Sequence, residues 1–263
     1  MDSTLNYLLF GWYPYLCVTV LIVGSILRFD KAQYSWRSQS SQFLRRKQML
    51  IGSNLFHMGV LVLVAGHFVG LLTPINVFDA VGISHGFKQT AALVVGGVAG
   101  LAAFVGCSML LHRRLFDSRI RRSSHWTDIA VLVLLWLQLA LGIATTFWTI
   151  DHLDGSEMVL FMGWANGLLT FNPAAADLIV NSALVYKLHI VLGLTLFLIT
   201  PFTRLVHIWS IPIFYLLRPG YQIVRTKGSL RAPEPTSLTH GPVSTPAGYG
   251  GPAVDRAQSE SGQ

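Results

Sequence analysis

Four histidines lie inside strongly apolar segments of this 263-residue chain: His57 and His67 in one segment, His189 and His207 in another. An ionisable or ligating side chain within a membrane-spanning segment is rare, and it marks a functional site by default. An imidazole can supply a nitrogen ligand to a metal. The four residues therefore predict a site for a metal or a metal-containing cofactor inside a membrane.

The composition is that of a membrane protein. Apolar residues make up 52% of the chain and charged residues only 12%, against about 25% in soluble domains, and the mean hydropathy is +0.53. Cys17 and Cys107 each lie in an apolar run, so they offer neither a disulfide framework nor a thiolate metal site. The net charge of +7 comes from Lys and Arg in short loops between apolar runs, which argues against nucleic-acid binding.

Five apolar stretches are each long enough to cross a hydrocarbon core, which takes about 20 helical residues. They cover residues 5–27, 51–73, 89–111, 128–149 and 183–212. The last stretch contains Pro201, which is expected to kink it because proline removes an intrahelical hydrogen bond. The sequence thus predicts an all-α membrane protein of five transmembrane helices.

Loop charges predict the direction of these helices, because Lys and Arg are retained on the cytoplasmic side. Basic residues cluster in the first and third loops, at 28–50 and 112–127. The second loop has Lys88 as its only basic residue, and the fourth, at 150–182, has acidic residues but neither Lys nor Arg. We therefore expect the N-terminus in the periplasm and the C-terminus in the cytoplasm, in a bacterial inner membrane.

Two other segments have patterns of their own. The sequence Asp-Gly-Ser-Glu at 154–157 precedes apolar residues and Trp164, which predicts a capped, amphipathic helix at the outer interface, ending near Pro173. From about Gly228 the chain is rich in Pro, Gly, Ser and Thr. We expect a membrane domain at 1–227 and a disordered cytoplasmic tail at 228–263.

The histidine spacings pair the two segments at two depths. With a helical rise of 1.5 Å per residue, His57 and His67 are about 15 Å apart, and His189 and His207 are about 27 Å apart on one helix face. Since the second and fifth spans run antiparallel, His57 and His207 fall towards the inner leaflet, and the other two towards the outer leaflet. The two histidines of each span are separated by different distances along the two helices, and the side chains of His57 and His67 point about 80° apart. A tilt of the helices and the kink at Pro201 must therefore compensate for this mismatch between the spans.

Two histidines at each depth suit a haem, a flat apolar plate that fits between helices and takes an imidazole on each face. With both axial positions filled, its iron is suited to passing single electrons rather than binding oxygen. Zinc is disfavoured, because no clear carboxylate or thiolate completes a tetrahedral set at either depth. The alternative is that each histidine is simply hydrogen-bonded between helices, which does not explain four in matched order.

Four glycines accompany the histidines of the second span: Gly52, Gly59, Gly66 and Gly70. Small residues allow close approach, either of a neighbouring helix or of a macrocycle. Taken alone, these glycines favour plain helix packing.

At these residues the sequence resembles the gamma subunit of membrane-bound respiratory nitrate reductase, a cytochrome b. The resemblance covers residues 1 to about 226 and includes the basic segment 28–42. The matching stretches are SNLFHMG (53–59), GHFVGLLTP (66–74), DGSEM (154–158), KLHIVLG (187–193) and RLVHIWSIP (204–212).

The resemblance implies a five-span subunit with two haems b between its second and fifth spans. His57 and His207 would ligate the inner (proximal) haem, and His67 and His189 the outer (distal) haem. The family oxidises quinol at the periplasmic side and passes electrons through the distal and then the proximal haem to an iron–sulfur subunit. The iron–sulfur subunit passes the electrons on to a molybdenum catalytic subunit, in which nitrate is reduced.

The resemblance also implies a quinol site near the distal haem, with Lys88 in FKQ (87–89) and with Gly66 leaving room for the quinol. An ammonium group can donate a hydrogen bond to a quinone oxygen. From the residues alone, the alternatives are a lysine snorkelling at a helix end and a glycine that packs a helix. The loop at 75–86 departs from the family in being one residue longer and in carrying His85.

Arg204 lies one short turn before His207. It could pair with a propionate of the proximal haem, or it could simply anchor the inner end of the span.

Two other functions for the whole chain also stay open. One is a haem b membrane subunit of another quinol-linked reductase, of the heterodisulfide or sulfite type, and the other is a cofactor-free transporter or anchor.

Overall fold

The computed structural model describes residues 3–32, 46–150 and 155–210, and all regular elements in these ranges are helical. In chain order the elements are α1 (Ser3–Tyr7), η1 (Leu8–Trp12), α2 (Tyr13–Ala32), α3 (Arg46–Leu72), α4 (Ile75–Ala80), α5 (His85–Phe116), α6 (Ser118–Ser123), α7 (Trp126–Thr149), α8 (Ser156–Leu169), η3 (Pro173–Ile179), α9 (Leu184–Ile199), η4 (Thr200–Phe202) and η5 (Arg204–Ser210). The predicted tail at 228–263 lies outside the described residues.

Five helices are long and apolar enough to cross a membrane, which confirms the number of predicted spans. They cover Thr4–Ala32, Arg46–Leu72, His85–Phe116, Trp126–Thr149 and Leu184–Phe202. The first four are longer than predicted, because polar and charged residues at their ends continue the helix beyond the apolar stretch. The fifth is shorter.

The fifth segment is not one kinked helix, and that prediction is wrong. The α-helix α9 ends two residues before Pro201, and Thr203 is extended (φ −122°, ψ −178°) before the 3₁₀-helical η5 begins. Proline cannot donate a backbone hydrogen bond, and its ring clashes with the preceding turn. Arg28 of α2 donates to the carbonyl oxygens of Pro201 and Thr203 at 2.7 and 2.8 Å, which satisfies backbone acceptors at the break. His189 and His207 therefore do not share one face of a continuous helix.

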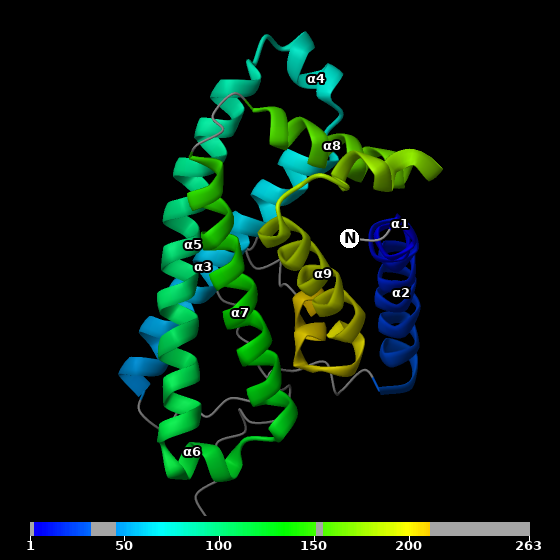
Figure 1. Cartoon of the computed structure of the whole chain (residues 1–263). Helices are drawn as coiled ribbons and strands as arrows, with labels where there is room; N and C mark the ends of the chain where they lie inside the picture. Colours follow the sequence, from blue (N-terminus) through cyan, green and yellow to red (C-terminus); the bar gives the residue numbers. More distant parts are fainter. Residues whose placement is uncertain (1–2, 33–45, 151–154, 211–263) are drawn as a thin grey trace, which may run out of the picture. The chain divides into compact units, whose positions relative to one another are not determined.

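The spans pack in an order that differs from their order along the chain (Figure 1). Helix α3 packs along α5, α5 along α7, α7 along α9, and α9 along α2. Of the five spans, α3 is the least buried within the described structure. His57 and His67 are both exposed on α3, so their side chains are available to groups other than α5.

The glycines of α3 divide into two kinds. A Cβ atom added at Gly59 would lie 2.5 Å from the carbonyl oxygen of Ala99 in α5, and one added at Gly52 would also meet α5 closely. By contrast, a Cβ atom added at Gly66 or Gly70 would have nothing within 4 Å. The first two glycines therefore pack a helix, as favoured from the sequence, whereas the last two border open space next to His67.

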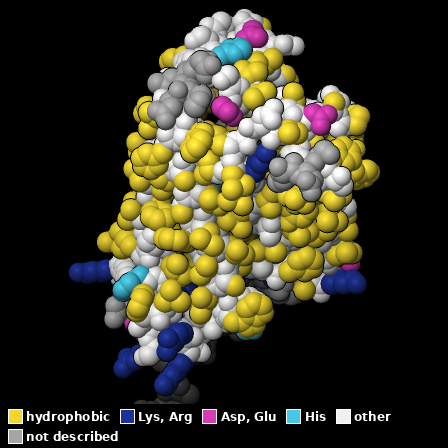
Figure 2. All heavy atoms as spheres, in the orientation of Figure 1, with side chains coloured by type: hydrophobic (Ala, Val, Ile, Leu, Met, Phe, Trp, Pro, Cys, Tyr) yellow, Lys and Arg dark blue, Asp and Glu magenta, His cyan; other side chains and the backbone are white. Residues whose placement is uncertain are grey.

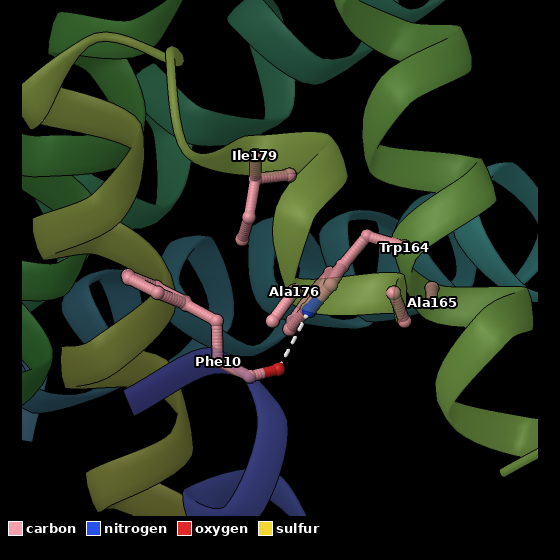
Figure 3. Packing of buried hydrophobic residues seen from close by; sticks show 6 residues of the cluster. Phe10, Trp164, Ala165, Ala176 and Ile179 are labelled. Atoms are coloured by element: carbon pink, nitrogen blue, oxygen red, sulfur yellow. Dashed lines mark hydrogen bonds between the residues drawn. The ribbon is translucent and has the colours of Figure 1, made fainter. Parts of the chain in front are cut away.

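The helix predicted after residue 154 is present as α8, which runs across the ends of the spans (Figure 1). It ends at Leu169, earlier than predicted, and its N-cap residue Gly155 makes no side-chain hydrogen bond, while its place at the outer interface stays a prediction. Together with η3 it packs on the start of the first span, where the indole nitrogen of Trp164 donates to the carbonyl oxygen of Phe10 at 2.9 Å (Figure 3). The Asn6 amide likewise donates to the carbonyl oxygen of Ala176 at 2.8 Å. Ile179 completes this buried cluster. These contacts fix the first span to the segment formed by α8 and η3.

Charged side chains gather at the two ends of the apolar surface. Figure 2 shows Lys and Arg mostly at the end of α6, and Asp and Glu mostly at the end of α4 and α8. Between the two ends the surface is predominantly apolar, as expected for a protein in contact with lipid. This distribution matches the loop charges on which the predicted orientation rests.

Candidate functional site: two histidine pairs

The four histidines meet in two pairs, each formed between α3 and the segment that contains α9 and η5. The ring centres of His57 and His207 are 6.4 Å apart, and those of His67 and His189 are 6.2 Å apart. These are the pairs expected from the antiparallel order of the two spans. The ligand role of each residue is a prediction that the pairing supports.

The spacing of the rings fits one metal ion between two imidazoles. A metal–imidazole bond is about 2.0 Å long and the ring centre lies about 1 Å behind the bonding nitrogen, so two such rings are centred about 6 Å apart. Among the described residues no hydrogen bond joins the two rings of either pair. Each pair therefore has the separation that two ligands of a shared iron require.

Backbone contacts select the nitrogen that is free to bind a metal in three of the four rings. Nδ1 of His57 and Nδ1 of His67 each lie 2.7 Å from the carbonyl oxygen four residues earlier, and Nδ1 of His207 lies 2.5 Å from the carbonyl oxygen of Arg204. A carbonyl oxygen only accepts, so each Nδ1 carries the proton and Nε2 presents its lone pair. Metal-ligating histidines are commonly oriented in this way.

The donor set at each depth is limited to two nitrogens. The described residues contain no group of three or more His, Cys, Asp or Glu side chains that could hold a metal ion. Cys17 and Cys107 are buried singly, each without a disulfide partner. Two imidazoles at iron spacing fit a haem and not a tetrahedral zinc ion. At the His67/His189 pair, Gly66 and Gly70 also leave open space.

An ion pair holds the segment that carries His207. Nε of Arg204 donates to Oδ1 of Asp128 at 2.6 Å, a second guanidinium nitrogen contacts Oδ2, and Arg114 lies 3.4 Å from the same carboxylate. Asp128 is not among the site residues predicted from the sequence. A carboxylate at the basic inner end of a predicted span was the available signal, since such a charge needs a partner. The propionate contact of Arg204 stays a prediction.

Lys88 lies at the start of α5, half-buried beneath α8. Its Nζ is 2.9 Å from Sδ of Met162 and 3.9 Å from the centre of the Phe78 ring. A thioether is a weak acceptor and an aromatic face attracts a cation, so these contacts position the ammonium while leaving it able to donate to a stronger acceptor. The additional His85 in this loop is hydrogen-bonded to Asp79 at 2.9 Å.

The fold and the site together define a class: an all-helical membrane protein with two bis-histidine sites between antiparallel spans. The nitrate reductase gamma subunit family matches residues 6–227. The respiratory nitrate reductase 1 gamma chain of Escherichia coli K12 is 45% identical over 223 residues, which cover 85% of this chain and 98% of that protein. The nitrate reductase gamma chain of Bacillus subtilis 168 is 39% identical over 220 residues, which cover 84% and 98%. The chain belongs to the nitrate reductase gamma subunit family.

Proposed function

We propose that this chain is the membrane anchor and quinol-oxidising cytochrome b subunit of a respiratory nitrate reductase. It takes electrons from quinol at the periplasmic side and delivers them to a cytoplasmic iron–sulfur subunit. Nitrate itself is reduced in a molybdenum-containing partner. The observation that carries this proposal is the presence of two histidine pairs in a chain of this family. The ring centres are 6.4 Å apart in the His57/His207 pair and 6.2 Å apart in the His67/His189 pair.

The histidine pairs hold two haems b in this proposal. His57 and His207 bind the proximal one, and His67 and His189 bind the distal one. Held by both histidines of a pair, a haem would supply one-electron redox chemistry rather than oxygen binding. The chain itself fixes the depth of each site, and backbone carbonyls keep His57, His67 and His207 in the tautomer that presents Nε2.

The charge distribution supports the orientation of the proposal. The arginines of α6 and the adjoining end of α5 face the cytoplasm, while α4, α8 and the acidic fourth loop face the periplasm. The distal pair then lies at the outer side, next to the α4 and α8 end. The basic inner surface is suited to docking the iron–sulfur subunit.

Lys88 and Gly66 form the proposed quinol site at the outer end. The ammonium of Lys88 donates a hydrogen bond to a quinol oxygen, and the open space at Gly66 admits the ring next to His67. Each quinol gives up two electrons and two protons, and the protons leave towards the periplasm. Because the electrons move inward while the protons leave outward, each turnover adds to the membrane potential.

Family membership favours nitrate reductase over the heterodisulfide- and sulfite-type alternatives. The experiment that tests the proposal follows the haem α-band in membranes that contain the chain together with its catalytic partners. A water-soluble quinol should reduce the haem, and nitrate, but not sulfite or a disulfide, should reoxidise it. Membranes with this chain alone should be reduced by quinol and stay reduced with nitrate. A colourless chain, or reoxidation by sulfite instead of nitrate, would contradict the proposal.

A further inference from the structure

The ring of His189 differs from the other three in its hydrogen bonding. Its Nδ1 is buried and meets no hydrogen-bond partner among the residues that the structure describes. Its neighbour is Gln138 of α7, whose amide nitrogen lies 3.4 Å from Nε2 of the ring and donates to the backbone carbonyl of His189 at 3.1 Å. The amide oxygen of Gln138 is also buried and lacks a partner in the same residues. An unpaired ring nitrogen and an unpaired acceptor are thus carried by two side chains in contact.

Glycines on both helices make room for this contact. A Cβ atom added at Gly142, one turn after Gln138, would lie 3.1 Å from Cε1 and 3.7 Å from Nδ1 of His189. A Cβ atom added at Gly193, one turn after His189, would lie 3.1 Å from the amide nitrogen of Gln138. Each separation of 3.1 Å is tighter than an ordinary van der Waals contact, so a side chain at either position would push the ring or the amide away.

We propose that Gln138 and Gly142 position the imidazole of His189 as a haem ligand. Gln138 supplies the acceptor for the ring N–H that does not face the iron, and Gly142 supplies the space in which the ring lies. This inference rests on the proposed haem function of the His67/His189 pair. Helix α7, which carries none of the four paired histidines, thereby tunes the outer site.

Histidines that ligate a metal share a pattern of hydrogen bonding at the ring nitrogen that does not bind the metal. The second ring nitrogen of such a histidine almost always donates to an acceptor, which fixes the ring and raises the basicity of the ligand. Backbone carbonyls do this for His57, His67 and His207. For His189, the Gln138 amide oxygen is an unused acceptor on a side chain whose amide nitrogen lies 3.4 Å from Nε2 of the ring, so a flip of that amide turns the acceptor towards the ring. A more basic ligand favours oxidised iron, so removing the acceptor should raise the midpoint potential of the outer haem.

The test compares two variants with two controls in the full complex. Gln138→Met keeps the length of the side chain but removes the amide, and Gly142→Ala adds the Cβ atom. Leu139→Met changes the next residue of α7, which packs in the cluster with Cys107 instead. Gly100→Ala is the glycine control, because its Cβ atom would meet the next span at an ordinary 3.8 Å.

The readouts are haem content per chain and a redox titration followed by low-spin EPR signals, with the outer haem identified as the one lost in His67→Ala. Gln138→Met should retain two haems and raise the midpoint potential of the outer haem alone. Gly142→Ala should change the EPR signal of the outer haem, or lose that haem, with the inner haem kept. Both controls should match the unsubstituted chain.

Unchanged outer-haem signals in both variants would overturn the inference, and so would equal shifts of both haems. A chain without substitutions that binds no haem would instead overturn the proposed function. The two failures are therefore distinguishable in one set of samples.

Discussion

Asp128 and Arg204, which are 76 residues apart in the sequence, form a two-point ion pair in the first turn of α7. Their side chains are only 13% and 17% exposed. The carbonyl oxygen of the same arginine accepts a hydrogen bond from Nδ1 of His207 at 2.5 Å. The ion pair therefore holds the short segment that follows the break at Pro201 and orients the imidazole proposed for the inner haem.

Asp128→Asn should impair the inner site selectively. The substitution keeps the size of the side chain but leaves Arg204 and Arg114 partly buried beside a neutral amide, which costs about 3 kcal/mol. We expect loss of the inner haem, or a shift of its spectrum, with the outer haem retained, as measured by haem content and reduced-minus-oxidised spectra. Asp79→Asn, which changes a carboxylate in α4, is the control. An inner haem with full occupancy and an unshifted spectrum would argue against this role of the ion pair.

Gly59→Ala should destabilise the contact between α3 and α5. The added Cβ atom would lie 2.5 Å from the carbonyl oxygen of Ala99, so the helices must separate, at a cost of about 1–3 kcal/mol. Thermal unfolding in detergent should show a lower midpoint. Gly96→Ala, where nothing lies within 4 Å of the added atom, should melt like the unsubstituted chain. Equal melting of the two variants would show that the glycine contact has no energetic role.

Lys88→Ala should slow quinol oxidation while leaving both haems in place. Losing a charged hydrogen bond of about 1.5–3 kcal/mol predicts a fall in kcat/KM of about ten- to a hundredfold. Steady-state quinol oxidation gives the rate, and spectra of the dithionite-reduced protein give the haem content. Lys31→Ala, at the end of α2, removes a lysine elsewhere and should have little effect. Normal turnover of Lys88→Ala would remove this residue from the quinol site.

Truncation after residue 228 should preserve membrane insertion and haem content. The family match ends at residue 227, and the predicted tail is poor in apolar residues that could pack against the spans. Membrane fractionation and haem spectra of the truncated chain measure both properties. Failure to assemble with the partner subunits would show that the tail belongs to an interface.

The sequence predicts those features of the site that depend on depth and order. Apolar runs set the five spans, and the antiparallel order of two of them pairs His57 with His207 and His67 with His189. The pairing is present although the assumed continuous helix is broken at Pro201, because the break changes the phase of the helix and not the order of its residues.

The remaining features depend on contacts between segments that are distant in the sequence. Asp128 and Gln138 acquire their roles only because α7 packs along α9, and hydropathy does not specify which spans are neighbours. Likewise, the four glycines of α3 share one local pattern. Only the position of α5 separates Gly59, which packs a helix, from Gly66, which borders open space.

The most direct test of two bis-histidine haem sites is to substitute each of the four histidines by alanine and to record haem content with redox-resolved difference spectra. His67→Ala and His189→Ala should lose one and the same haem, and His57→Ala and His207→Ala should lose the other. If His67→Ala and His57→Ala instead removed the same haem, or if any of the four variants retained both haems unchanged, the proposed pairing would be contradicted.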